Sequence, residues 1–76
     1  MAVAELWGKR ISGVKVDSFK WVKGVWWSVW WEENNEPKEI IFREFRNAME
    51  YATALRGGLV SDDYLKLMEI DSIRML

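Results

Sequence analysis

The chain has 76 residues, 11 basic and 12 acidic side chains, and neither cysteine nor histidine. This length gives one small domain with a thin core, and the missing residue types exclude disulfides, thiolate zinc sites and the usual nucleophile and base pairs. Because no apolar run reaches the length of a signal peptide or the ~20 residues of a membrane span, we expect a soluble cytoplasmic protein that does not contact membranes.

The first part of the chain is predicted to be an irregular arm followed by a strand. Residues 1–12 are rich in apolar side chains but show no regular period, so we expect an N-terminal arm that is irregular or weakly extended. Residues 14–22 have the β-branched and aromatic composition of a strand. The short turn Lys23-Gly24 follows, and if it is a two-residue loop, Trp21 lies opposite Trp26.

The most distinctive segment is 25–31, which holds four of the six tryptophans. Dense β-branched and aromatic residues favour a strand, which we place at the centre of a sheet. A strand directs alternate side chains to opposite faces. One face carries Val25, Trp27, Val29 and Trp31, and the other carries Trp26, Ser28 and Trp30. Both faces therefore carry tryptophan, and one helix can cover only one of them.

A polar turn and a third strand follow the tryptophan-rich segment. Asparagine tolerates left-handed conformations, and the residue before Pro37 is pushed out of the helical region, so residues 33–36 are expected to form the turn. Residues 38–44 form the next strand. With a four-residue loop, two pairs share the core face, namely Val29 with Ile40 and Trp27 with Phe42.

From residue 45 the apolar residues recur every three or four positions, which predicts an amphipathic helix over 45–56. Its apolar positions are Phe45, Ala48, Met49, Ala52 and Leu55. The pair Gly57-Gly58 ends the helix, because glycine takes the left-handed conformation without steric cost. The small alanines let the helix approach the rings of the sheet closely.

Residues 64–70 fit two structures. Leu65 and Leu67 alternate as in a strand, whereas a three-residue spacing from Leu67 suits a helix capped by Ser61. We favour the strand, because a helix that crosses back over a sheet delivers the chain to pair along another strand. Residues 71–76 are expected to be an apolar tail.

Together these elements predict an α+β fold in a single domain over residues 1–76. An antiparallel sheet of three to four strands carries one helix on one face. The order of the elements is β-β-β-α-β over residues 14–70.

The sequence offers little catalytic chemistry. Four glutamates crowd the turn after the tryptophan-rich strand: Glu32, Glu33, Glu36 and Glu39. Carboxylates at this spacing can hold calcium or magnesium, but no glycine shapes the loop and the EF-hand spacing is absent. Asp62-Asp63 is interpreted as turn or capping chemistry, and Gly57-Gly58 follows a helix whereas a phosphate loop precedes one. We therefore expect no metal, no cofactor, no small-molecule substrate and no enzymatic activity.

The second aromatic face is the feature that points to a function. We predict a partner-binding site made of Phe19, Trp21, Trp26, Trp30 and Ile41, with Arg43 and Lys20 at its margins. An exposed aromatic patch of this size is typical of a protein interface or a homodimer seam. In the alternative interpretation, the N-terminal arm and the C-terminal tail cover these rings and form a second small core.

Single-stranded nucleic acid is the alternative partner. Bases stack on exposed aromatic side chains, and Lys15, Lys20 and Lys23 lie close to these rings in the sequence. Residues 1–23 carry five basic and two acidic side chains (+3), whereas residues 24–76 carry six and ten (−4). The acidity of the longer part favours a protein partner over a polyanion.

The order of elements from Trp26 to Ile70 is an aromatic strand, a second strand, an alanine-rich helix and a returning strand. This order resembles that of the small host-takeover proteins of bacteriophages, such as the podophage inhibitor of bacterial RNA polymerase. The resemblance covers the order of elements only, and no functional residue is carried over. It implies a small inhibitor or regulator that binds a surface of a larger host protein in the cytoplasm of the host cell.

Overall fold

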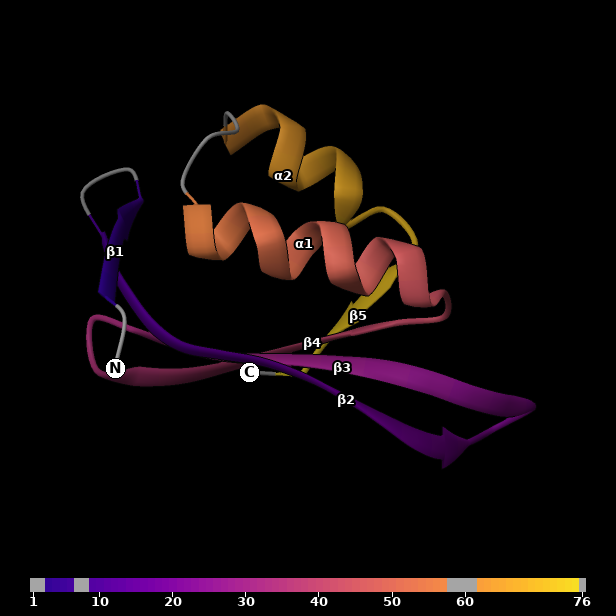
Figure 1. The fold of residues 1–76 in the computed structure, drawn as a ribbon. Helices are drawn as coiled ribbons and strands as arrows, with labels where there is room; N and C mark the ends of the chain where they lie inside the picture. Colours follow the sequence, from indigo (N-terminus) through magenta and orange to yellow (C-terminus); the bar gives the residue numbers. More distant parts are fainter. Residues whose placement is uncertain (1–2, 7–8, 58–61, 76) are drawn as a thin grey trace.

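The computed structural model describes residues 3–6, 9–57 and 62–75 (Figure 1). The strands are β1 (Val3–Leu6), β2 (Lys9–Trp21), β3 (Gly24–Glu33), β4 (Glu36–Phe42) and β5 (Ser72–Arg74). The helices are α1 (Phe45–Gly57) and α2 (Asp62–Met68). The strands form one sheet in the order β1-β2-β3-β4-β5, in which all neighbours are antiparallel. The α+β fold with a helix packed on an antiparallel sheet is therefore confirmed.

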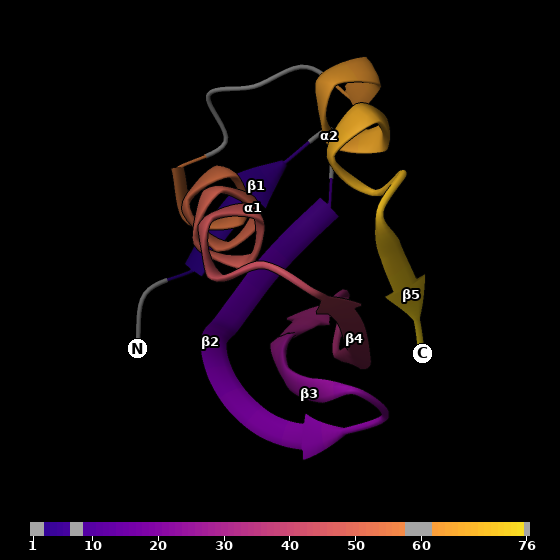
Figure 2. The same ribbon diagram turned by 90° about the vertical axis from the view of Figure 1, so that its right-hand side faces the viewer.

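Both helices lie on the same side of the sheet and connect β4 to β5 (Figures 1 and 2). Helix α1 packs on the first three strands and on β4, and α2 lies beside α1. No helix within the described ranges combines the length and the apolarity needed to cross a membrane.

The turn between β3 and β4 has the predicted asparagines and register, but it is two residues long and not four, because Glu33 and Glu36 pair with each other. Asn34 and Asn35 have φ angles of 51° and 68°, and positive φ at both central residues is the hallmark of a tight hairpin turn whose twist matches its strands. Two core pairs are confirmed, namely Val29 opposite Ile40 and Trp27 opposite Phe42.

The turn between β2 and β3 differs from the prediction by one position. Val22 and Lys23 form it, and Trp21 lies opposite Gly24. Trp26 consequently lies opposite Phe19 and not opposite Trp21. Lys23, with a φ of 62°, is the second turn residue, and Gly24 begins β3 with a φ of 130°, a conformation that only glycine adopts readily. Because each partner moves by two positions, every side chain keeps its predicted face.

Where residues 1–12 are described, they are extended and paired, which agrees with the extended alternative and not with an irregular arm. Val3–Leu6 pairs with the start of β2, and β2 begins at Lys9. A register shift between Ser12 and Lys15 interrupts β2, and Gly13 takes a φ of 64° there. This β-bulge exchanges the two faces of the strand. Ile11 before it and Val14 and Val16 after it all pack on the core, so no single alternating period runs through β2.

The core lies between α1 and one face of the sheet. Its buried residues from the central strands are Val29, Trp31, Ile40 and Phe42, and those from α1 are Ala48, Tyr51, Ala52, Ala54 and Leu55. Trp27 packs against this cluster and against the Phe45 ring at 4.7 Å. Val25 lies on the same face but is 50% exposed, because the β2–β3 hairpin runs past the end of α1 (Figure 1).

Residues 64–70 do not form the predicted strand. Most of this segment belongs to α2, and the strand comes later, within the predicted apolar tail, as β5. Leu65 is 4% exposed and Met68 also packs on the core, whereas Leu67 is 63% exposed. A spacing of three residues places Leu65 and Met68 on one helical face toward α1. The proposed Ser61 cap lies outside the described residues.

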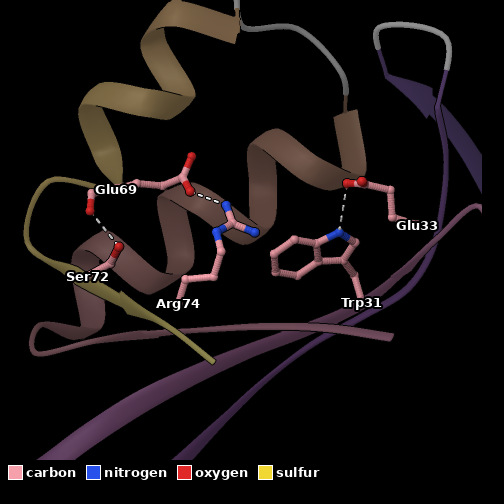
Figure 3. Close-up of polar contacts among 5 residues, drawn as sticks. All are labelled: Trp31, Glu33, Glu69, Ser72 and Arg74. Carbon is pink, nitrogen blue, oxygen red and sulfur yellow. Dashed lines mark hydrogen bonds and ion pairs between the residues drawn. The ribbon is translucent and has the colours of Figure 1, made fainter. Parts of the chain in front are cut away.

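Polar contacts hold β5 in place (Figure 3). Arg74 forms an ion pair with Glu69, and the Ser72 hydroxyl donates to the Glu69 carbonyl at 2.6 Å. The Arg74 guanidinium also donates to the Tyr51 hydroxyl. Burial raises the pKa of Tyr51 to about 12, and the negative charge of Glu69 adds to this rise.

Candidate partner-binding surface

The rings of Phe19, Trp21 and Trp26 come together on the face of the sheet opposite α1. Phe19 and Trp26 are directly opposed on neighbouring strands. The Trp21 ring lies 6.1 Å from the Phe19 ring and 5.4 Å from the Trp26 ring, the latter in an edge-on arrangement. Aromatic pairs in this distance range stabilise one another beyond their area of contact. These three rings with Arg43 are called the aromatic cluster below.

Trp26 is held in one orientation within this cluster. Its indole Nε1 donates a hydrogen bond to the Val22 carbonyl at 2.8 Å. The Arg43 guanidinium carbon lies 5.1 Å from the centre of its ring, a cation–π contact. The ring is half-buried, whereas Trp21 is 44% exposed. The cluster is therefore an ordered aromatic surface that still meets solvent.

A hollow adjoins the cluster where the sheet meets the first turn of α1. Its volume is about 260 Å³, and it is lined by Trp26, Arg43, Glu44, Asn47, Asp71, Ser72 and Ile73. The lining combines an apolar wall with charges of both signs. Five of these lining residues were not predicted as site residues, since only the folded chain brings the α2–β5 connection and the start of β5 beside the start of α1: Glu44, Asn47, Asp71, Ser72 and Ile73.

Trp30 lies on the same face of β3 but apart from the cluster. Ser28 separates it from Trp26 along the strand, and Glu39 lies opposite Trp30 on β4. The Ser28 hydroxyl donates to the Glu39 carboxylate at 2.5 Å, and Ser28 is 3% exposed. A polar contact thus divides the aromatic face into two parts. Trp30, which is half-buried, borders a separate hollow with Lys15 and Pro37.

Two other predicted site residues are not positioned to touch a partner at the cluster. Ile41 is on the predicted face but only 3% exposed, between Ser28 and Ile73 of the neighbouring strands. Lys20 lies opposite Val25 on the helix side of the sheet. Ile41 therefore supports the surface from within, and Lys20 faces away from it.

Of the chain's two ends, only the C-terminal one has described side chains near this face. Strand β5 extends this face at its edge, where Ile73 is 39% exposed opposite Ile41. The side chains of residues 1–9 lie outside the described part of the structure. Phe19 and Trp26 are half-buried and Trp21 is exposed, so this aromatic face is at least partly open to solvent.

The glutamates of the turn have separate contacts. Glu33 accepts a hydrogen bond from the Trp31 indole at 3.5 Å (Figure 3), Glu36 lies 3.8 Å from the Lys38 ammonium, and Glu39 accepts from Ser28. Among the residues that the structure describes, no group of three or more side chains is arranged to hold a metal ion.

Comparison of the chain with models of protein families, with curated proteins and with solved structures gives no significant match.

Proposed function

We propose that the chain is a non-catalytic interaction module that binds a larger protein through the aromatic cluster. The observation that supports this most is the contact between Trp21 and Trp26 on a sheet face that α1 leaves uncovered. Tryptophan and arginine are the residues most enriched among the anchors of protein interfaces, and Arg43 lies directly over Trp26.

The arrangement of Trp26 favours tight binding. Ordering a flexible side chain at an interface costs about 0.5–1.5 kcal/mol, and Trp26 is already fixed by Val22, Trp21 and Arg43. The mixed charges of the adjoining hollow suit a polypeptide that brings both apolar and polar groups. The surface therefore fits a protein partner better than a purely apolar ligand.

The order of elements supports a role as a small regulator or inhibitor. From β3 onward the order is strand, strand, helix, helix and strand, so the resemblance to phage host-takeover proteins rests on the first three elements and on β5. On this proposal the protein acts in the cytoplasm, where it occupies a surface of a larger host protein.

Affinity capture with matched variants tests the proposal. The double variant Trp21→Ser/Trp26→Ser removes two anchors, and Leu67→Ser removes an apolar side chain that is 63% exposed on α2, away from the cluster. We expect a host protein that is captured by the wild type and by Leu67→Ser, with at least about a 30-fold loss for the double variant, since anchor residues contribute about 2 kcal/mol or more each. Circular dichroism checks that each variant is folded. A folded double variant that retains every captured protein contradicts the proposal.

Single-stranded nucleic acid is the second candidate, because Lys15 is exposed opposite Trp30 on the same face. Asp17 and Glu39 also lie on this face, and their carboxylates repel phosphates. Titration of tryptophan fluorescence with oligonucleotides separates the two candidates. Binding that weakens steeply with added salt supports the nucleic-acid function, and the absence of binding at low salt removes it.

A further inference from the structure

Strand β2 has a long outer edge with no partner strand. Strand β1 pairs with it only from Lys9 to Ser12, and β3 occupies its other edge. From Lys15 to Trp21, no strand of the described chain pairs with the outer edge of β2. Its first part lies beside the core, since Val16 packs there, and only the tip of the β2–β3 hairpin runs past α1 (Figure 1). An unpaired edge of this length is a template for pairing with another strand.

The backbone groups that point outward from this edge follow from the register of β2 and β3. Trp21 and Gly24 close the two-residue turn as a hydrogen-bonded pair, and such pairs alternate with pairs that are not hydrogen-bonded. The N–H and C=O groups of three residues therefore point away from β3, namely Val16, Ser18 and Lys20. The Val14 carbonyl, at the bulge, accepts a hydrogen bond from Arg56 at 3.1 Å, which marks the end of the open edge.

We infer that a second copy of the chain pairs with this edge, antiparallel and about a twofold axis at Ser18. An antiparallel edge is self-complementary under a twofold axis perpendicular to the sheet. The open edge spans seven residues from Lys15 to Trp21, and Ser18 is its midpoint. Pairing about Ser18 therefore uses the whole edge and forms about six backbone hydrogen bonds between the copies.

Other registers of the two β2 strands that keep the two aromatic clusters on the same face of the joined sheet are less favourable. A twofold axis at Asp17 sets the two Asp17 carboxylates directly opposite each other, and opposed like charges destabilise a strand pair. An axis at Val16 brings Lys20 of the second copy to Ser12, a position that β1 already occupies. An axis at Phe19 leaves Lys15 beyond the end of the pairing.

The register about Ser18 also matches side chains across the two copies. Lys15 of one copy lies opposite Trp21 of the other, on the face of the aromatic cluster, where a lysine ammonium and an indole ring attract each other. The two aromatic clusters then adjoin in one continuous sheet. A dimer thus presents a doubled aromatic surface.

Sedimentation equilibrium over about 1 to 500 µM tests the dimer, because small interfaces dissociate in the micromolar range. In the inferred dimer, the two Ser18 side chains lie opposite each other at the twofold axis. Ser18→Lys and Ser18→Glu each place like charges at the axis, which should weaken self-association by about tenfold or more. Ser18→Ala keeps the backbone N–H and is the matched control. Ser18 is exposed, so these variants should fold, and circular dichroism verifies this.

We expect the wild type and Ser18→Ala to dimerise, each charged variant to be monomeric alone, and an equimolar mixture of Ser18→Lys and Ser18→Glu to recover the dimer. A wild type that stays at 9.0 kDa throughout, or a charged variant that dimerises as well as the wild type, overturns the inference. Failure here is distinct from failure of the proposed function, because that function requires the aromatic cluster and not the β2 edge. A monomeric Ser18→Lys that still captures the host protein shows that the two surfaces act separately.

Discussion

Ionisation of Tyr51 should destabilise the fold at high pH. Tyr51 is 2% exposed, and its ring lies 5.7 Å from Trp31 and 5.3 Å from Phe42. Burial raises its pKa from the ordinary value of 10.0 to about 12. Because the folded state holds the phenol proton more tightly than the unfolded state does, the stabilisation is complete below pH 10 and is lost as the pH rises toward 12.

The size of this loss follows from the shift in pKa. Each pH unit between the two pKa values lowers the free energy of unfolding by about 1.4 kcal/mol, so the whole interval removes about 3 kcal/mol. Arg74 opposes the shift, since its guanidinium donates to the Tyr51 hydroxyl and stabilises the phenolate. Replacement of Arg74 by methionine should therefore raise the pKa of Tyr51 further.

Urea unfolding of the wild type and of Tyr51→Phe, followed by tryptophan fluorescence between about pH 8 and pH 12, measures the effect. Lysine and arginine ionise in both proteins, so the difference between the two isolates Tyr51. We expect that difference to move by about 3 kcal/mol in favour of Tyr51→Phe as the pH rises from 10 to 12. Tyrosinate absorbance in a Tyr64→Phe background gives the pKa of Tyr51 directly. If the stability difference stays constant between pH 10 and pH 12, the pKa of Tyr51 is not raised by folding.

Two further predictions concern stability. Phe42→Ala should lower the free energy of unfolding by about 3–5 kcal/mol, because Phe42 is 0% exposed. Phe45 is 52% exposed, so Phe45→Ala should lower the free energy of unfolding by less than half as much. Equal losses in urea unfolding would show that the core is not centred on Phe42. Lys23→Gly should raise the free energy of unfolding by about 0.5–1 kcal/mol, because relief of the left-handed conformation outweighs the extra freedom of glycine in the unfolded chain. Lys23 has a φ of 62°, and a lower unfolding temperature for Lys23→Gly would contradict this assignment of strain.

The sequence determined the parts of this fold that depend on local chemistry. Alternation along residues 25–31 placed Trp26 and Trp30 on one face and Val29 on the other, and the tolerance of Asn34 and Asn35 for positive φ defined the β3–β4 turn. The predicted register is correct because the expected four-residue loop and the observed two-residue turn share the same centre. The spacing of small and apolar residues likewise predicted α1, with Gly57 at its end.

Features of the fold that depend on contacts between distant segments followed only from the tertiary structure. The bulge at Gly13 exchanges the faces of β2, so its period became visible only against β3. Residues 64–70 carry two competing periods, and burial of Leu65 against α1 selected the helix. The division of the aromatic face could not be predicted from the sequence either. Burial of Ile41 and the hydrogen bond between Ser28 and Glu39 both depend on the pairing of β3, β4 and β5. The local conformational preferences of a short chain can be predicted from its sequence. Its thin core is formed by side chains from many segments, and tertiary packing determines which of them become buried.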